Sequence, residues 1–325
     1  MSALLSNSAP KVSVIIPTYK TADLIATCLD SVFAQVYTDF EAIVVNDGSP
    51  DTPELEKVLA PYRGRIVYLK QENQRAAAAR NNAIRRSRGE FLALLDSDDS
   101  WLPNHLASQM QLFADDPSLD LVYANAALVG DPARQRTFMK ECPSEGPATF
   151  ESLIVKRCQI PVSTVVVRKK KFLETGFFDE TMARCDDYDM WVRCSLHGAK
   201  IGYLRTVQAR LFTGRPGSLG TSGARNLEAY CIILDKLRHT FPLSEAHRKV
   251  VDQRAAEVRA LYLLEEGKCQ LAERNFGKAR ELISEANRYM HRPTLSLAVL
   301  GLGIAPHAAS AAMSFWRRVR SGVSA

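Results

Sequence analysis

The sequence predicts an α/β fold in which a parallel sheet is covered by helices on both faces and is followed by a mainly helical C-terminal region. Short apolar runs alternate with helical patterns through the first hundred residues. These runs are apolar throughout, which is typical of strands buried on both faces. Beyond residue 225 strand patterns cease and apolar residues recur at helical spacing. We therefore expect one α/β domain over residues 1–225 and a helical extension over residues 226–325.

The first elements alternate strand and helix. The expected strand Val12–Ile16 is rich in β-branched residues and is ended by Pro17. A helix is expected over Thr21–Gln35, where apolar residues recur every three or four positions. A second strand, Phe40–Val45, runs into Asn46–Pro50, whose residue types favour a turn.

The next elements continue this alternation. Glu54–Tyr62 has helical spacing, Ile66–Leu69 has a strand pattern, and Gln74–Ser87 is an alanine-rich helical run. Phe91–Leu95 comprises five apolar residues between a glycine and a carboxylate, which indicates a buried strand. Strands separated by helices pair in parallel, so their carboxyl ends should meet at one edge of the sheet, where ligands bind in open α/β folds.

From about Leu119 the pattern changes to mixed strands and loops. A strand is expected over Val162–Arg168, a helix over Asp186–His197, and a further strand through Leu211–Phe212. The extension contains three helical runs: Leu227–Leu237, Val250–Glu266 and Phe276–Tyr289.

The composition is that of an ordinary folded protein, with 46% hydrophobic and 24% charged residues among 325. The net charge of +6 permits an anionic partner, but no nucleic-acid-binding signature accompanies it, so nucleic acid is not expected. Seven cysteines without a Cys-x-x-Cys pair are typical of a reducing compartment. We recognise no secretory signal and no apolar run of about 18 residues, so we expect a cytoplasmic location.

Polar clusters follow three of the expected strands: Pro17–Tyr19, Asn46–Ser49 and Asp96–Asp99. In the last cluster, Asp96, Asp98 and Asp99 concentrate negative charge that a divalent cation would relieve. Mg²⁺ or Mn²⁺ held by one or two carboxylates usually completes its ligands with phosphates and water. The alternative is that this run only caps a helix beginning near Pro103.

Further motifs occur in a fixed order with these clusters. The set comprises Val14–Tyr19, Val44–Ser49, Ala79-Arg80-Asn81 after Glu72-Asn73, Leu95–Asp99 with Trp101-Leu102-Pro103, Gly176–Glu180, and Asp186–Trp191. Together they resemble the family 2 glycosyltransferases, enzymes of the GT-A (Rossmann-like) fold that use nucleotide-sugar donors and invert the anomeric centre. The resemblance covers roughly residues 11 to 220.

The resemblance implies roles for individual residues. Asp98 would be a direct ligand of the cation, Asp96 would face ribose and metal, and Asp99 would support them. The donor-binding residues implied are Pro17, Thr18, Tyr19, Asp47, Arg80, Asp96, Ser97 and Arg215. Three of these have a structural alternative. Tyr19 would pack on the sheet edge, Asp47 would form an Asx-turn, and Arg80 would be a solvated arginine on an amphipathic helix.

The resemblance also implies a catalytic base. The cluster Asp186–Asp189 stands where relatives carry Glu-Asp, which assigns the base to Asp187, with Asp186 in support. Because Asp186 is shorter than the usual Glu, which carboxylate is the base stays open. The alternative is that these carboxylates only stabilise a helix N-terminus.

Two positions depart from the family pattern. Relatives have a Tyr-Arg-x-His run where this chain has Phe212–Ser218, and Arg215 within it would contact the diphosphate. Arg75 stands where many relatives have glycine.

The expected function is transfer of a sugar from a nucleotide-sugar donor to a sugar or lipid-linked saccharide acceptor. The expected donor is a UDP-sugar, and the expected process is cell-envelope or extracellular polysaccharide synthesis. One alternative is a degenerate sugar-binding or scaffold protein. A nucleotidyltransferase is another, but it should carry a Gly-rich basic loop after the first strand, where this chain has Pro17–Lys20.

The C-terminal segment favours attachment to the inner face of the cell membrane. No acidic residue follows Glu285, and two apolar pieces, Leu295–Ala305 and Ala308–Trp316, are separated by Pro306. Each is too short to span a bilayer. Short apolar helices beside arginines suit a peripheral anchor on anionic lipid. The alternative is that they pack on the catalytic domain or form a dimer interface.

Overall fold

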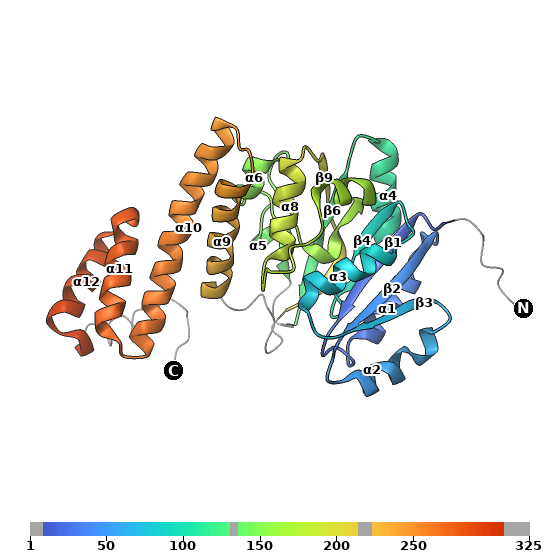
Figure 1. Ribbon diagram of the computed structural model, residues 1–325, viewed down its shortest axis with the longest axis horizontal. Helices are drawn as coiled ribbons and strands as arrows, with labels where there is room; N and C mark the ends of the chain where they lie inside the picture. The colour runs from blue at the N-terminus through green and yellow to red at the C-terminus, as the bar shows by residue number, and fades with distance from the viewer. Residues whose placement is uncertain (1–8, 131–135, 214–222, 309–325) are drawn as a thin grey trace, which may run out of the picture. The chain divides into compact units, whose positions relative to one another are not determined.

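The computed structural model describes residues 9–130, 136–213 and 223–308. Its contacts divide the chain into two compact units, residues 1–218 and 219–325, which are described separately. Figure 1 shows the elements of each unit along the chain.

One mixed sheet organises the first unit. Within the described residues its strands lie in the order β3-β2-β1-β4-β8-β6-β9-β5, with β7 paired to β6. Their bounds are β1 Val12–Thr18, β2 Phe40–Asp47, β3 Ile66–Gln71, β4 Phe91–Leu94, β5 Ser100–Trp101, β6 Leu121–Val129, β7 Arg136–Thr137, β8 Val166–Arg168 and β9 Ile201–Phe212.

The parallel part of the sheet consists of β1 to β4, as the sequence predicts. β1 pairs in parallel with β2 on one side and β4 on the other, and β2 pairs in parallel with β3. From β8 onward the pairing is mixed, because β8 is antiparallel to both β4 and β6. The carboxyl ends of β1, β2 and β4 therefore lie at the same edge.

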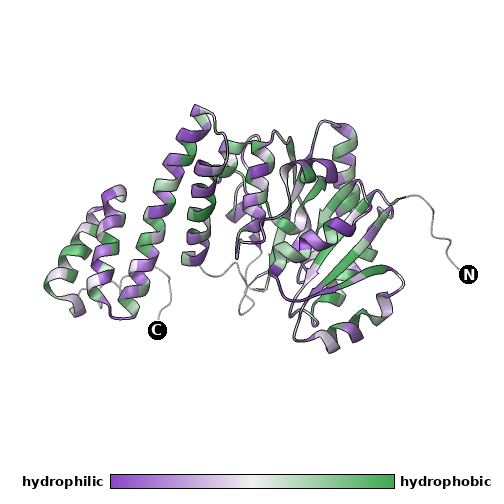
Figure 2. Cartoon of the chain, viewed as in Figure 1, coloured by the Kyte–Doolittle hydropathy of each residue, from purple (hydrophilic) through white to green (hydrophobic). Residues whose placement is uncertain are grey.

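Helices cover both faces of the parallel strands. The helices described in this unit are α1 Ile25–Phe33, α2 Thr52–Leu59, α3 Arg75–Arg86, α4 His105–Asp115, α5 Phe138–Glu141, α6 Phe150–Ile154, α7 Lys169–Thr175 and α8 Asp186–Leu196. Val14 and Ile16 of β1 share a core cluster with residues of α1 and α2. Ile15, between them in the strand, is equally buried, and α3 packs on β1 and β2. Figure 2 shows the apolar colour along these strands. Burial on both faces explains why the strand runs are apolar throughout.

One expected strand is shorter than its sequence pattern. Val162–Thr164 forms a 3₁₀ helix, η2, and only Val166–Arg168 pairs in the sheet. The Thr164 hydroxyl donates to the carbonyl of Pro161 at 2.9 Å, and its amide donates to the same carbonyl at 3.0 Å. These local bonds satisfy backbone groups that a strand would pair across the sheet, so the β-branched residues here do not extend β8.

The second unit is helical. It comprises α9 Gly223–Thr240, α10 Glu245–Ala272, α11 Phe276–Met290 and α12 Pro293–Ile304. A Cβ at Gly267 of α10 would lie 2.8 Å from Ile283 Cγ1 of α11, so glycine permits these two helices to pack closely. Among the described residues, no helix is both long and apolar enough to cross a membrane.

Candidate active site

A buried chain of hydroxyl groups joins the ends of β1 and β4. Thr18 Oγ1 lies 2.8 Å from Thr21 Oγ1, which lies 2.8 Å from Ser97 Oγ. All three residues are buried. The parallel register thus brings two of the polar clusters together, as their positions after neighbouring strands predict.

Tyr19 follows Thr18 and is 43% exposed. The Lys20 ammonium lies 5.2 Å from the centroid of its ring. The exposed face offers a flat surface to an aromatic partner.

Asp47, at the end of β2, is buried and anchors the chain that leads into α3. Its Oδ1 accepts from Gln71 Nε2 at 2.8 Å and from the Gln74 amide at 2.9 Å. Burial raises the pKa of Asp47 above its ordinary value, although these donors act in the opposite direction. The turn role considered for Asp47 belongs to Asn46, whose Oδ1 accepts from the Ser49 amide at 2.9 Å.

Arg80 is the buried link between two carboxylate groups of the site. Its side chain is 5% exposed and donates to Asp96 Oδ1 at 2.6 Å and to Asp186 Oδ2 at 2.7 Å. The solvated alternative is therefore wrong. The alanines before Arg80 explain its placement, since small buried side chains let this part of α3 pack close to the sheet. The ion pairs connect the end of β4 to the start of α8.

The Asp96–Asp99 run forms a turn held by the protein around it. The Asp99 amide donates to the Asp96 carbonyl at 3.0 Å. Asp99 Oδ2 accepts from Ser163 Oγ at 2.5 Å, and its Oδ1 accepts from the Phe212 amide at 2.8 Å. The capping alternative is wrong, because α4 begins only at His105 with Asn104 at its N-cap position.

The electrostatics of this turn favour a cation. Burial and the neighbouring charges of Asp98 and Asp96 raise the pKa of Asp99 well above its ordinary value. Carboxylate oxygens are the ligands that Mg²⁺ and Mn²⁺ prefer. Within the described ranges no group of three or more His, Cys, Asp or Glu side chains is arranged to hold a metal ion. The two carboxylates Asp96 and Asp98 fit a cation whose remaining ligands are substrate phosphates.

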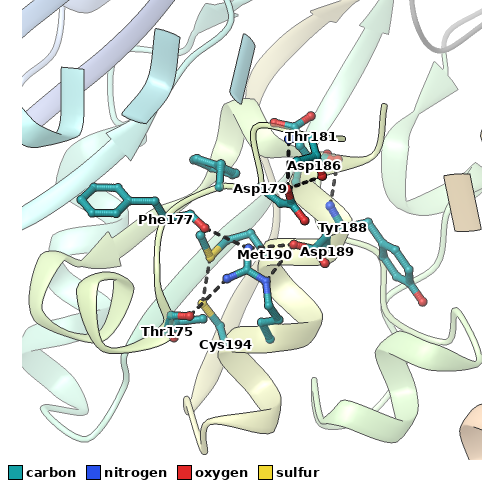
Figure 3. Close-up of polar contacts among 12 residues, drawn as sticks. Thr175, Phe177, Asp179, Thr181, Asp186, Tyr188, Asp189, Met190 and Cys194 are labelled. Atoms are coloured by element: carbon teal, nitrogen blue, oxygen red, sulfur yellow. Dashed lines mark hydrogen bonds and ion pairs between the residues drawn. The ribbon is translucent and has the colours of Figure 1, made fainter. Parts of the chain in front are cut away.

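The acidic residues of α8 make different contacts, and Figure 3 shows Asp186 and Asp189 among the polar contacts around the start of this helix. Asp189 is buried and pairs with Arg193 at 2.7 Å. Arg193 also donates to the carbonyls of Thr175 at 3.2 Å and Phe177 at 3.0 Å, so this pair holds the segment after α7. Asp189 therefore has a structural role.

Asp187 lies half-buried in the first turn of α8, next to the Arg80-bound Asp186. Its Oδ1 accepts from the Tyr188 amide at 2.8 Å. Burial, followed by the charge of Asp186, raises the pKa of Asp187 to about 6. A carboxylate with this pKa can accept a proton near neutral pH more readily than an ordinary aspartate.

Sequence reasoning missed the roles of two buried side chains. Asn81 Nδ2 donates to the Phe178 carbonyl at 2.9 Å and to Glu180 Oε1 at 2.8 Å, while its Oδ1 accepts from the Phe178 amide at 3.0 Å. It thereby fixes the segment Gly176–Glu180 before α8. Ser163, which contacts Asp99, was included in an expected strand. Asn81 stood in a recognised motif, whereas no sequence signal distinguished Ser163.

The two departures from the family pattern have different outcomes. Arg215 lies outside the described residues. Arg75 has φ +74°, a conformation that glycine adopts at little cost and other residues rarely adopt. The backbone thus keeps the glycine-type conformation at this position with an arginine side chain.

The family model of glycosyl transferase family 2 matches residues 13–168. A curated protein named uncharacterized glycosyltransferase from Rickettsia felis is 31% identical over 189 residues, which are 57% of this chain and 31% of that protein. The putative glycosyltransferase EpsH of Bacillus subtilis is 41% identical over 119 residues, 36% of this chain and 34% of that protein. The chain thus spans about a third of the length of the first curated relatives it matches.

Two solved structures have a similar fold. S. aureus TarS 1–349 superposes with a TM-score of 0.64 at 18% identity, covering 86% of this chain and 80% of that one. The mannosyltransferase PcManGT from Pyrobaculum calidifontis, in complex with GDP-Man and Mn²⁺, superposes with a TM-score of 0.59 at 19% identity, covering 96% and 89%. At these identities the likeness shows the fold, which is that of GT-A glycosyltransferases.

Proposed function

Through residues 13–168 the chain belongs to glycosyl transferase family 2, and we propose that it is an inverting glycosyltransferase that moves a sugar from a nucleoside-diphosphate donor to an acceptor hydroxyl. The observation that carries this proposal is the buried Arg80, which pairs with Asp96 on one side and with Asp186 on the other. These contacts support the proposal because they join the turn that would hold the donor diphosphate to the start of α8, where Asp187 would face the acceptor hydroxyl.

The donor would bind along the edge where β1, β2 and β4 end. Tyr19 would stack on the base, Asp47 would accept a hydrogen bond from its ring N–H, and Ser97 and Arg80 would lie toward the ribose and diphosphate. Asp96 and Asp98 would hold Mg²⁺ or Mn²⁺, which supplies charge neutralisation of the departing diphosphate.

Asp187 would act as the general base. Its carboxylate takes the proton of the acceptor hydroxyl while that oxygen forms a bond to the anomeric carbon on the face opposite the diphosphate. The bond from the anomeric carbon to the diphosphate oxygen breaks, and its electron pair leaves with the nucleoside diphosphate. One displacement inverts the anomeric centre without a covalent intermediate.

The donor class is proposed from the solved relatives. TarS was solved in complex with UDP-GlcNAc and PcManGT with GDP-Man. We propose a UDP-sugar donor and an acceptor in envelope or extracellular polysaccharide synthesis.

Donor binding is tested by thermal unfolding with UDP- and GDP-sugars, each with and without Mn²⁺. We expect one nucleotide-sugar to raise the unfolding midpoint only when Mn²⁺ is present, because a ligand of the folded state stabilises it. The same donor should be slowly hydrolysed to its nucleoside diphosphate. ATP with Mn²⁺ is the control for general phosphate binding.

The outcomes separate the candidate functions. Stabilisation without donor hydrolysis or transfer to any acceptor would favour a degenerate sugar-binding protein. Cleavage between the two phosphates of the donor would indicate a nucleotidyltransferase. No response to any nucleotide-sugar would contradict the proposed function.

We also propose peripheral attachment to the inner face of the cell membrane through α12. Its side chains Leu297, Leu300 and Ile304 are 69%, 57% and 76% exposed, while Leu302 is buried in the cluster that contains Ile283 of α11. These three exposed side chains share a helix that contains no charged residue. An exposed apolar face within a segment that lacks acidic residues suits an anionic lipid surface.

Replacing Leu297, Leu300 and Ile304 together by serine should shift the protein from membranes to the soluble fraction and abolish sedimentation with anionic liposomes at low salt. Deleting all of α12 is less suitable, because this would remove Leu302 and expose the apolar side chains of α10 and α11 in its cluster. The matched control replaces Val36 and Val155, exposed valines of the first unit, by serine. Full-length protein that ignores anionic liposomes, or that forms a dimer through this face, would contradict the anchor.

A further inference from the structure

We propose that Ser163 is a positioning residue for the cation-binding turn Asp96–Asp99, an inference that rests on the proposed function. Its Oγ accepts a hydrogen bond from the Asp96 amide at 3.1 Å and donates to Asp99 Oδ2 at 2.5 Å. One hydroxyl therefore contacts both the first and the last residue of the turn. The position of this hydroxyl therefore fixes how the turn presents its carboxylates.

Ser163 is itself held in place by three elements. It is 1% exposed, and its carbonyl accepts from Trp101 Nε1 at 2.7 Å. The carbonyl of the next residue, Thr164, accepts from Gln109 Nε2 of α4 at 2.8 Å, and the Thr164 hydroxyl accepts from the Ala124 amide of β6 at 3.2 Å. A hydroxyl on a backbone fixed in this way is a preorganised partner, since little of its freedom is lost when it orders the turn.

Asp99 extends this connection to β9. While Oδ2 accepts from Ser163, Oδ1 accepts from the Phe212 amide at 2.8 Å. Both Asp99 oxygens thus have neutral donors supplied by the protein. We infer that Asp99 connects the turn to β9, and that Asp96 and Asp98 are the cation ligands.

Loss of the Ser163 hydroxyl should loosen the turn. The Asp96 amide and the Asp99 carboxylate would lose their shared partner, and the three carboxylates would move apart because their charges repel one another. Cation binding would then have to bring the carboxylates together again, and this cost would reduce the affinity for the cation. A hydrogen bond to a charged group is worth enough that Ser163→Ala should weaken Mn²⁺ binding by about tenfold or more.

The test measures Mn²⁺ binding directly, from the electron paramagnetic resonance signal of unbound Mn²⁺, with UDP and GDP as parallel probes. Ser163→Ala should raise the Mn²⁺ dissociation constant, and Ser163→Thr, which keeps the hydroxyl, should restore it. The matched control is Ser144→Ala. Ser144 is also buried and hydrogen-bonded, to the Tyr123 hydroxyl at 2.7 Å. Both alanine variants should lower the unfolding midpoint, but only Ser163→Ala should weaken Mn²⁺ binding.

A second route uses Asp99→Asn, which keeps the size of the side chain while removing its charge. If Ser163 acts through Asp99, the effects of Ser163→Ala and Asp99→Asn on Mn²⁺ affinity should be less than additive in the double variant. Equal Mn²⁺ affinity of Ser163→Ala and the unaltered protein would overturn the inference alone. Additive effects, or an equal loss in Ser144→Ala, would overturn it as well. Absence of Mn²⁺ binding to the unaltered protein with either nucleotide would overturn both the inference and the proposed function.

Discussion

Replacing Asp98 by alanine is expected to lower turnover by about 10³-fold or more, since a bound cation contributes several kcal/mol of transition-state stabilisation. Donor binding should be lost together with turnover, because the cation neutralises the phosphates as well as the carboxylates. Calorimetric titration with the donor identified by thermal unfolding, in the presence of Mn²⁺, measures the loss of donor binding. A steady-state assay of nucleoside-diphosphate release measures the loss of turnover.

The control for Asp98→Ala is Asp115→Ala, which removes an exposed carboxylate of α4. This variant should retain the donor affinity and turnover of the unaltered protein. A chelator should inactivate the unaltered protein, and added Mn²⁺ should restore it. Near-normal activity of Asp98→Ala, or indifference to the chelator, would show that Asp98 does not hold a required cation.

Local sequence patterns were sufficient to predict the sheet edge at which the polar clusters lie. Thr18 and Ser97 follow strands that pair in parallel with each other, so their proximity follows from chain direction and register. Asp47 was also placed correctly at the end of β2. These residues are close because of regular elements, and regular elements have sequence periodicity.

The contacts that complete the site could not be predicted in this way. Arg80 and Asp186 are 106 positions apart and meet only because α3 and α8 pack in the same unit. Ser163 lies in a run of β-branched residues that has a strand pattern but forms a 3₁₀ helix. The Arg80–Asp186 contact and the conformation at Ser163 both depend on the hydrogen bonds of the folded chain, which local sequence propensity does not predict.

The assignment of the base is tested by Asp187→Asn, which should reduce kcat by about 10²–10⁴ while leaving donor affinity largely unchanged. The asparagine keeps the shape of the side chain and an oxygen that can accept from the Tyr188 amide, so the start of α8 should be preserved. Folding raises the pKa of Asp187 to about 6, so this carboxyl group is harder to ionise in the folded than in the unfolded state. The folded state therefore loses stability as pH rises from the ordinary pKa of aspartate to about 6, and the loss persists at pH 7. Asp187→Asn should therefore unfold at the same temperature as the unaltered protein at pH 7, or at a higher one.

The pH profile provides an independent readout of the same assignment. A base with a pKa of about 6 is protonated below that pH, so kcat/KM of the unaltered protein should fall as pH decreases through 6. The residual activity of Asp187→Asn should lack this fall. Asp186→Asn is the matched variant, and it should lower stability because it weakens the buried contact with Arg80. A large loss of kcat in Asp186→Asn with none in Asp187→Asn would transfer the role of base to Asp186, since both carboxylates lie in the first turn of α8 and only one can receive the acceptor proton.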